Sequence, residues 1–178
     1  MKHLFLFIDR VFHKILRTYR NYVFYAKTGN RANLVGGITL INRNIVCGKN
    51  VTIYPDVMLF GDGKIEIGDN VDIGNGTIIY ASKAGGVTIG SNTMIAAQCY
   101  IIDTDHGTGI EKMMNQQENT VDKVIIGSDC WLAANVTVLK GSHICDGAVV
   151  GAKSLVKNVV EANSIVVGVP CKKIKMRT

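Results

Sequence analysis

Branched aliphatic residues recur every six positions in the last third of the chain. The series consists of Ile126, Leu132, Val138, Ile144, Val150 and Val156. The same spacing appears earlier, at Ile67, Ile73, Ile79 and at Ile89, Ile95, Ile101. A short fixed period indicates repeated units, each of which buries its apolar face against its neighbours. Because six residues match neither the helical period nor simple alternation, the period predicts short strands separated by turns.

Three such strands form one triangular coil of 18 residues, and successive coils stack about 4.8 Å apart. Residues 34–167, minus interruptions, provide about six or seven coils. The residue four positions after each aliphatic is usually small, which suits the narrow part of a triangular core; these residues are Cys130, Val136, Ser142, Ala148 and Ser154. The sequence therefore predicts an all-β fold, a parallel β-helix.

The five cysteines do not indicate disulfides or a metal site. Cys99 and Cys130 occupy the small inward position of their hexads, and Cys145 follows the aliphatic residue of its hexad. Buried thiols of this kind are typical of proteins from a reducing compartment. No pair has the spacing of a zinc site, so we expect no metal.

The positive charge of the chain is concentrated at its beginning. Residues 1–31 contain seven basic residues and one acid, a net charge of +6, which equals the net charge of the whole chain. Apolar residues keep helical spacing here and basic residues take the other side; the apolar ones are Leu4, Ile8, Val11, Phe12, Ile15, Leu16, Tyr19 and Val23. Residues 1–31 are therefore predicted to form an amphipathic basic α-helix.

Two roles for this helix stay open. It can cap the first coil and pack against partner subunits, or residues 1–25 can lie on an anionic membrane surface. A membrane-spanning helix is excluded, because Asp9 and Arg10 interrupt the apolar run well short of about 20 residues. Nucleic-acid binding is not expected, since the basic residues are confined to one helix.

The repeat stops after Ile101 and resumes at Ile126, which leaves an inserted loop at about residues 102–123. A long loop on a regular solenoid is usually functional, because the scaffold does not require it. The loop carries His106, preceded by Asp103 and Asp105. A histidine beside carboxylates can be held in one tautomer and act as a general base.

The only tryptophan, Trp131, precedes Leu132 and takes the last position of its hexad. We expect it at a corner of the coil, facing outward. An outward tryptophan on a solenoid indicates a contact surface, with substrate or with another subunit.

Three segments resemble the hexapeptide-repeat acyltransferases, in particular the maltose/galactoside and cell-surface polysaccharide O-acetyltransferases. They are Ile-Ile-Asp-Thr-Asp-His at residues 101–106, the run from Trp131 to Val138, and Gly-Val-Pro-Cys-Lys-Lys-Ile at residues 168–174. The resemblance implies a left-handed parallel β-helix over residues 32–170, followed by a basic tail, residues 171–178. It also implies a homotrimer, with acetyl-CoA bound in the cleft between two subunits.

The resemblance assigns roles to individual residues. His106 matches the catalytic base, and the backbone N–H of Ala134 matches the oxyanion donor. Acceptor binding is implied for Asn75, Asp103, Asp105, Glu118 and Trp131. Coenzyme binding is implied for Ala134, Ala152, Lys153, Pro170, Lys172 and Lys175, the last two as partners of the phosphates. The Asp-Thr-Asp sequence before His106 is closer to the polysaccharide branch and favours a glycan acceptor.

The predicted function is acetyl-CoA-dependent O-acetylation of a sugar or a cell-surface polysaccharide precursor, by direct transfer with no acyl-enzyme. The expected location is the cytoplasm, with a peripheral position at the inner face of the membrane as the alternative. N-acetylation of an amino sugar stays open, because the same base can serve an amine. A non-catalytic or metal-dependent β-helix is the other alternative. However, a γ-type carbonic anhydrase needs three zinc-binding histidines, and only His106 and His143 lie beyond the N-terminal helix.

Overall fold

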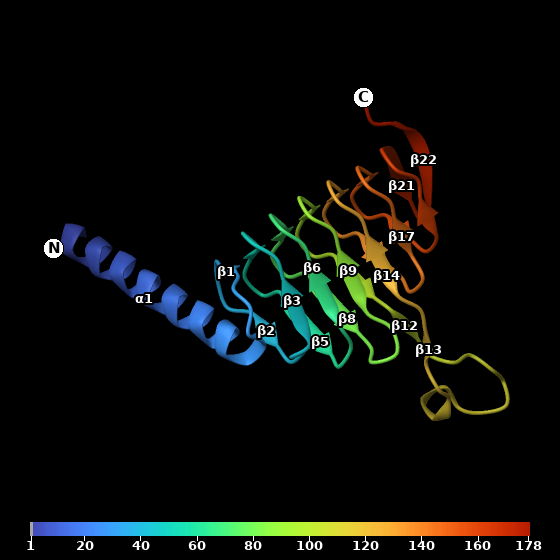
Figure 1. Cartoon of the computed structure of the whole chain (residues 1–178), viewed down its shortest axis with the longest axis horizontal. Coiled ribbons are helices and arrows are strands. Elements are labelled where there is room, and N and C mark those ends of the chain that lie inside the picture. Colours follow the sequence, from blue (N-terminus) through green and yellow to red (C-terminus); the bar gives the residue numbers. More distant parts are fainter. Residues whose placement is uncertain (1) are drawn as a thin grey trace.

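The computed structural model describes residues 2–178 and has one long helix followed by a parallel β-helix (Figure 1). Each coil contributes one strand to each of three sheets. The first sheet contains β1 (Asn33–Leu34), β4 (Thr52–Ile53), β7 (Asp72–Ile73), β10 (Met94–Ile95), β15 (Trp131–Leu132), β18 (Val149–Val150), β21 (Ser164–Gly168) and β22 (Cys171–Met176). The predicted fold class is confirmed: a parallel β-helix, indicated by the hexads, with an N-terminal α-helix, indicated by the amphipathic pattern.

The other two sheets have six strands each. The second contains β2 (Thr39–Leu40), β5 (Met58–Gly61), β8 (Ile78–Ala81), β11 (Tyr100–Ile102), β16 (Thr137–Val138) and β19 (Leu155–Val156). The third contains β3 (Ile45–Cys47), β6 (Ile65–Ile67), β9 (Val87–Ile89), β14 (Val124–Ile126), β17 (His143–Ile144) and β20 (Val159–Val160). Within these three sheets the strand pairs are parallel, except that β22 folds back antiparallel on β21.

The hexad aliphatics form the core of the prism. Ile73 pairs with Ile53 on one side and Ile95 on the other, so identical positions stack from coil to coil. The small inward residues bond to the neighbouring coil: the Thr93 hydroxyl donates to the Gly127 carbonyl at 2.8 Å and accepts from the Cys130 N–H at 3.2 Å. Among residues 2–178, every buried side-chain nitrogen and oxygen has a hydrogen-bond partner. Regular stacking with full polar pairing gives a rigid scaffold.

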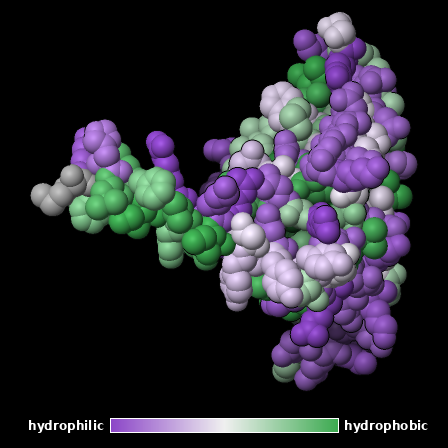
Figure 2. Space-filling view, turned by 60° about the vertical axis from the view of Figure 1, so that its left-hand side comes forward, coloured by the Kyte–Doolittle hydropathy of each residue, from purple (hydrophilic) through white to green (hydrophobic). Residues whose placement is uncertain are grey.

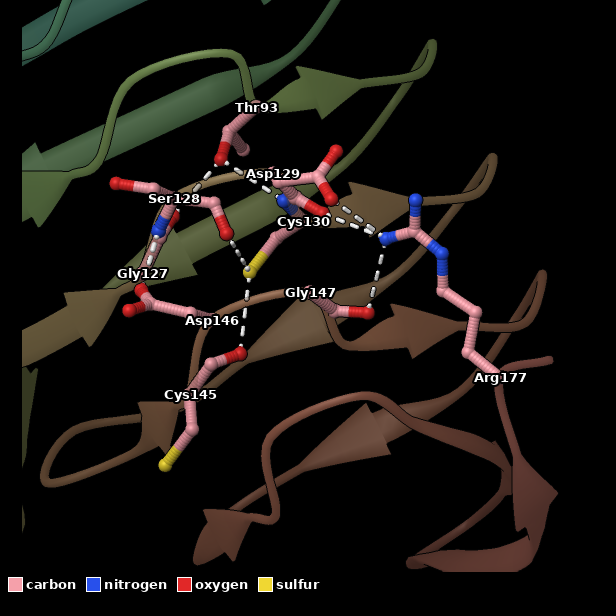
Figure 3. A network of polar contacts seen from close by, with 9 residues as sticks. All are labelled: Thr93, Gly127, Ser128, Asp129, Cys130, Cys145, Asp146, Gly147 and Arg177. Atoms are coloured by element: carbon pink, nitrogen blue, oxygen red, sulfur yellow. Dashed lines mark hydrogen bonds and ion pairs between the residues drawn. The ribbon is translucent and has the colours of Figure 1, made fainter.

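The corner between the third and first sheets carries a ladder of side chains. The amides of Asn50, Asn70 and Asn92 bond to one another at 3.0 Å, and all three residues have positive φ. In the next coil the ladder position is Asp129, whose carboxylate accepts from Arg177 at 2.8 Å (Figure 3). Asparagine and aspartate tolerate this left-handed conformation better than most residues.

Arg177 fastens the end of the chain to this corner. Besides Asp129, its guanidinium donates to the Gly147 carbonyl at 3.3 Å (Figure 3). Its backbone N–H donates to the Asn163 carbonyl. Gly147 is required at its position, since φ is +71° and a Cβ would lie 2.1 Å from the Asn163 side chain. Arg177 therefore clips the C-terminal tail across three coils.

The helix α1 extends from Lys2 to Thr28. Only its C-terminal half touches the coils: Arg17 donates to the Asn33 side chain, the side-chain amide oxygen of Asn21 accepts from the Leu34 N–H, and Phe24 is buried. The remainder projects beyond the first coil (Figure 1).

Candidate active site

The inserted loop leaves the solenoid after β11 and returns at β14. Its two ends pair as an antiparallel hairpin of β12 (Thr104–Asp105) and β13 (Thr120–Val121), and a 3-10 helix, η1 (Met114–Gln116), lies in its outer part. The hairpin projects from the corner between the second and third sheets (Figure 1). His106 follows β12 directly, so the hairpin sets its position.

Asp103 anchors this hairpin from inside the coil. The side chain is 0% exposed, and its carboxylate accepts from the N–H groups of Ser82 and Gly86 at 2.6–2.9 Å and from the Ser82 hydroxyl at 3.0 Å. Gly85 must be glycine here, because a Cβ would lie 2.4 Å from the carboxylate. All hydrogen bonds of the Asp103 carboxylate are internal and its side chain has no accessible surface in the single chain, which gives it an anchoring role; its predicted contact with the substrate stays a prediction.

His106 and Asp105 are exposed on the single chain. The Asp105 carboxylate lies 3.8 Å from the Lys140 ammonium. Burial raises the pKa of the Tyr100 hydroxyl, and the neighbouring Tyr80 and Asp105 raise it further. His106, the base predicted from the sequence, thus directly follows Asp105, whose carboxylate is paired with Lys140. Asp105 also neighbours Tyr100 of the second sheet, which in turn neighbours Tyr80.

Lys140 and Tyr100 were missed by the sequence reasoning. For Lys140 the signal was the coil register: Ile101 pairs with Val138, so Lys140, two positions after Val138, lies one coil from the start of the hairpin. Aligning the hexads on either side of the insert finds Lys140 by this rule.

Glu118 lies on the returning arm of the hairpin and is exposed. Gly107 packs closely against this arm: a Cβ there would lie 2.8 Å from the Gln117 Cβ and 2.9 Å from the Glu118 carbonyl. The Gln117 amide bonds to both backbone groups of Gly109 at 2.8 Å. The loop therefore brings Glu118 to the segment of His106, and its role as an acidic partner stays a prediction.

Asn75 and Trp131 line one hollow on the outer face of the first sheet, together with Tyr54, Asp72, Met94 and Ala96. Trp131 is 47% exposed and stacks in register with Met94 and Val149. It faces outward as predicted, but from the flat strand β15 and not from a corner. The Asn75 amide donates to the Pro55 carbonyl and to Asp56, which leaves its carbonyl oxygen available.

Ala134, Ala152 and Lys153 lie in successive turns between the first and second sheets. The Lys153 N–H donates to the Ala134 carbonyl at 3.0 Å, so these turns stack one above the other. The Ala134 N–H has no hydrogen-bond partner within residues 2–178. A free backbone donor at this corner is compatible with the predicted oxyanion role, which stays a prediction, as do the coenzyme contacts.

The C-terminal lysines separate into two groups. Lys172 pairs with Val167 and Lys175 with Ile165, positions that share the outer face of β21 because side chains alternate along a strand. Lys173 instead makes a 2.6 Å ion pair with Glu161. Pro170 forms the turn before β22, with a cis peptide bond. Lys172 and Lys175 therefore present their charges together.

Four cysteines, two buried and two partly buried, offer no prepared nucleophile. Burial raises the pKa of Cys99, Cys130 and Cys171, and raises that of Cys47 to about 12. The thiolate is the nucleophilic form, and a raised pKa suppresses it at neutral pH. This chemistry argues against an acyl-enzyme formed on these four residues.

Comparison with known proteins identifies the family. The profile of the bacterial transferase hexapeptide family (six repeats) matches residues 123–158. WbbJ of Escherichia coli strain K12, named for lipopolysaccharide biosynthesis O-acetyl transfer, is 37% identical over 140 residues, 72% of this chain and 69% of WbbJ. This chain belongs to the hexapeptide-repeat acyltransferases. As a member of that family it is an acyltransferase enzyme, and the resemblance seen in the sequence is confirmed.

Two further relatives agree. WcaF of the same strain, named for colanic acid biosynthesis, is 34% identical over 132 residues, 73% of this chain and 68% of WcaF. The solved structure of a Ser-to-Cys variant of AntD, an N-acyltransferase from Bacillus cereus, has a TM-score of 0.74 and 27% identity, and covers 83% of this chain and 82% of AntD. That structure contains dTDP-4-amino-4,6-dideoxyglucose and coenzyme A.

Proposed function

We propose that this acyltransferase transfers an acetyl group from acetyl-CoA to a hydroxyl of a sugar in a cell-surface polysaccharide precursor. The observation that carries the proposal is the single exposed histidine of the inserted loop, His106, held on a hairpin that the buried Asp103 anchors. The names of WbbJ and WcaF support both the acetyl group and the polysaccharide.

In the proposed reaction His106 removes the proton of the acceptor hydroxyl as that oxygen attacks the thioester carbonyl carbon. The carbon–sulfur bond then breaks, an ester forms on the sugar, and the departing thiolate takes the proton from the imidazolium. The oxyanion of the tetrahedral intermediate needs a fixed donor, for which the Ala134 N–H is available. Asp105 next to His106 stabilises the imidazolium.

The homotrimer is part of this proposal. His106 lies on the hairpin between the second and third sheets, whereas Asn75 and Trp131 line a hollow on the first sheet that does not include His106. Residues on different faces of one prism can serve one reaction if each site forms between two subunits of a closed ring. We therefore propose that His106 of one subunit acts at the Trp131 hollow of the next.

The test of the function is a screen of acceptors with acetyl-CoA, with release of free thiol as the signal. It includes nucleotide sugars, oligosaccharides and lipid-linked glycans, each as the hydroxyl form and the corresponding amino form. Thiol release only with hydroxyl acceptors, and an alkali-labile ester on the product, are expected. Transfer only to amino sugars would favour the second candidate, N-acylation, which the amino-sugar complex of AntD supports.

Trp131→Ala is expected to raise the KM for the acceptor roughly 10-fold or more while the coils stay folded, because the removed surface is exposed and not part of the core. Steady-state kinetics with a varied acceptor measures this. Loss of the folded assembly would assign Trp131 to packing.

The proposed site between two subunits can be tested by mixing this variant with His106→Ala. Subunits carrying Trp131→Ala are mixed and reassembled with subunits carrying His106→Ala and assayed at an acceptor concentration below the raised KM. The mixture should be more active than the average of the two unmixed variants, since some interfaces then combine two intact halves. Activity no higher than that average, in verified mixed assemblies, would locate both residues in one subunit's site.

Replacing Lys172 and Lys175 by alanine is expected to weaken coenzyme A binding roughly 10-fold, because two charges opposite the phosphates are lost. Isothermal titration with coenzyme A measures the affinity. Arg177→Ala is the matched control, since its charge is already paired with Asp129; it should lower stability slightly and leave coenzyme affinity unchanged. If Arg177→Ala weakened coenzyme A binding as much as the Lys172/Lys175 double substitution does, the two lysines would have no specific role.

A further inference from the structure

The projecting half of α1 exposes an apolar face. Phe5, Phe12 and Ile15 are 60–68% exposed, although each is a large apolar side chain. At about 100° per residue most of the exposed apolar side chains of α1 gather on one side, and Leu6 lies on the opposite side. The apolar face consists of Leu4, Phe5, Ile8, Val11, Phe12, Ile15, Tyr19 and Tyr22. Figure 2 shows hydrophobic surface along the projecting part of the helix. A continuous apolar surface of this kind marks an interaction site.

The β-helix does not cover this face. The contacts with the coils come from another side of the helix, through Arg17, Asn21 and Phe24. The hydrogen bonds and the ion pair of residues 2–16 stay within the helix: His13 with Asp9, and Thr18 with Lys14. The apolar face therefore needs a partner other than its own solenoid.

The charge of the helix indicates the chemistry of that partner. Lys2, Lys14, Arg20 and Lys27 lie on the borders of the apolar face at the helical period, and Asp9 is the only acid within residues 1–31. The coils carry as many acids as bases, so the net charge of +6 belongs to this segment. Long basic side chains beside aromatic and aliphatic ones suit anionic headgroups above an apolar layer.

We propose that α1 docks on the surface of an anionic phospholipid bilayer, lying in the interface with its apolar face toward the acyl chains. It does not cross the bilayer, because no helix within residues 2–178 combines the length and apolarity that a span requires. A second copy of the chain fits this face less well. Packing two such helices would bring their basic borders together, with one Asp9 per chain to offset them.

The experiment is co-sedimentation of the full chain with vesicles of phosphatidylcholine alone or mixed with phosphatidylglycerol. Binding to the anionic vesicles only is expected. It should weaken in ~1 M salt, where the screening length falls to about 3 Å. Phe12→Glu with Ile15→Glu should abolish binding. Neither residue touches the coils, so thermal unfolding of the β-helix should not change.

The charge is tested separately. Lys2→Gln with Lys14→Gln should weaken binding roughly 30-fold, at about 1 kcal/mol for each basic residue near an anionic surface. The matched control is Lys83→Gln with Lys157→Gln, the same loss of charge from exposed lysines of the coils, and should leave binding unchanged.

Three outcomes would overturn the proposal: no binding to anionic vesicles, equal binding by the Phe12/Ile15 variant, or an equal loss with the control pair. Sedimentation equilibrium adds a fourth. If the parent protein does not bind vesicles, and the Phe12/Ile15 variant forms a smaller oligomer than the parent, the apolar face is an interface between copies of the chain.

Discussion

His106→Ala is expected to lower turnover at least ~10²-fold, the size of effect typical of a lost general base. The variant keeps the coils and the hairpin, because His106 is exposed and the hairpin is fastened by Asp103 and by backbone pairing with β13. Both kcat and kcat/KM should fall by the same factor, since the base acts only in the transition state. Coenzyme affinity and the oligomeric state should not change.

The control is His143→Ala. His143 is the other histidine of the coils, exposed on β17 and paired with Ile125, away from the hairpin. The chemical change is the same, and turnover should stay at the parent value. Near-parent turnover in His106→Ala, measured as thiol release with the acceptor found in the screen, would remove His106 from the reaction.

The sequence predicted the scaffold well because the six-residue spacing of buried aliphatic residues recurs from coil to coil. Ile73, Ile79 and Ile101 are fully buried, as their spacing requires, and Thr93 fills the narrow part of the core beside Cys130. The period could not fix the hand of the coil, because six residues per side fit a prism of either hand. Left-handedness came from the resemblance and not from the spacing.

The candidate site was predicted less completely. The break in the repeat located His106, but the resemblance implied only acceptor binding for Asp103 and did not indicate its buried anchoring position. Alternation along β11 carried the correct signal: Ile101 points inward and Ile102 outward, so residue 103 points inward again. The same rule places Trp131, next to the inward Leu132, on the outer face of its strand.

The helix shows why local patterning cannot identify a partner. The amphipathic pattern predicted α1 correctly, but a pattern does not say which surface meets the apolar face. Asn21 and Phe24 contact the first coil from another side of the helix, so the apolar face stays exposed. Tertiary placement here overrides the expectation that an apolar stripe packs on the nearest core.

Asp103→Ala is expected to lower the free energy of unfolding by about 3 kcal/mol. The carboxylate accepts from two backbone N–H groups and one hydroxyl in a fully buried position, and each buried donor left without a partner costs about 1–3 kcal/mol. Alanine also leaves space between the start of the hairpin and the turn that contains Ser82 and Gly86. Denaturant unfolding measures the change.

The same substitution should lower kcat roughly 10- to 100-fold, because His106 lies three residues beyond the lost anchor and small displacements of a catalytic group are costly. Saturating substrate should not restore the rate. Hydrogen exchange of the amides in β12 and β13 should accelerate, which reports release of the hairpin directly.

Asp62→Ala is the matched control. Asp62 lies at the same corner two coils earlier, is exposed, and has no side-chain partner among the described residues. It should change neither stability nor turnover. If Asp103→Ala kept the parent free energy of unfolding and only raised the KM for the acceptor, the carboxylate would contact the substrate. If stability falls and exchange accelerates together with the loss of kcat, the buried carboxylate positions the histidine and does not take part in the reaction.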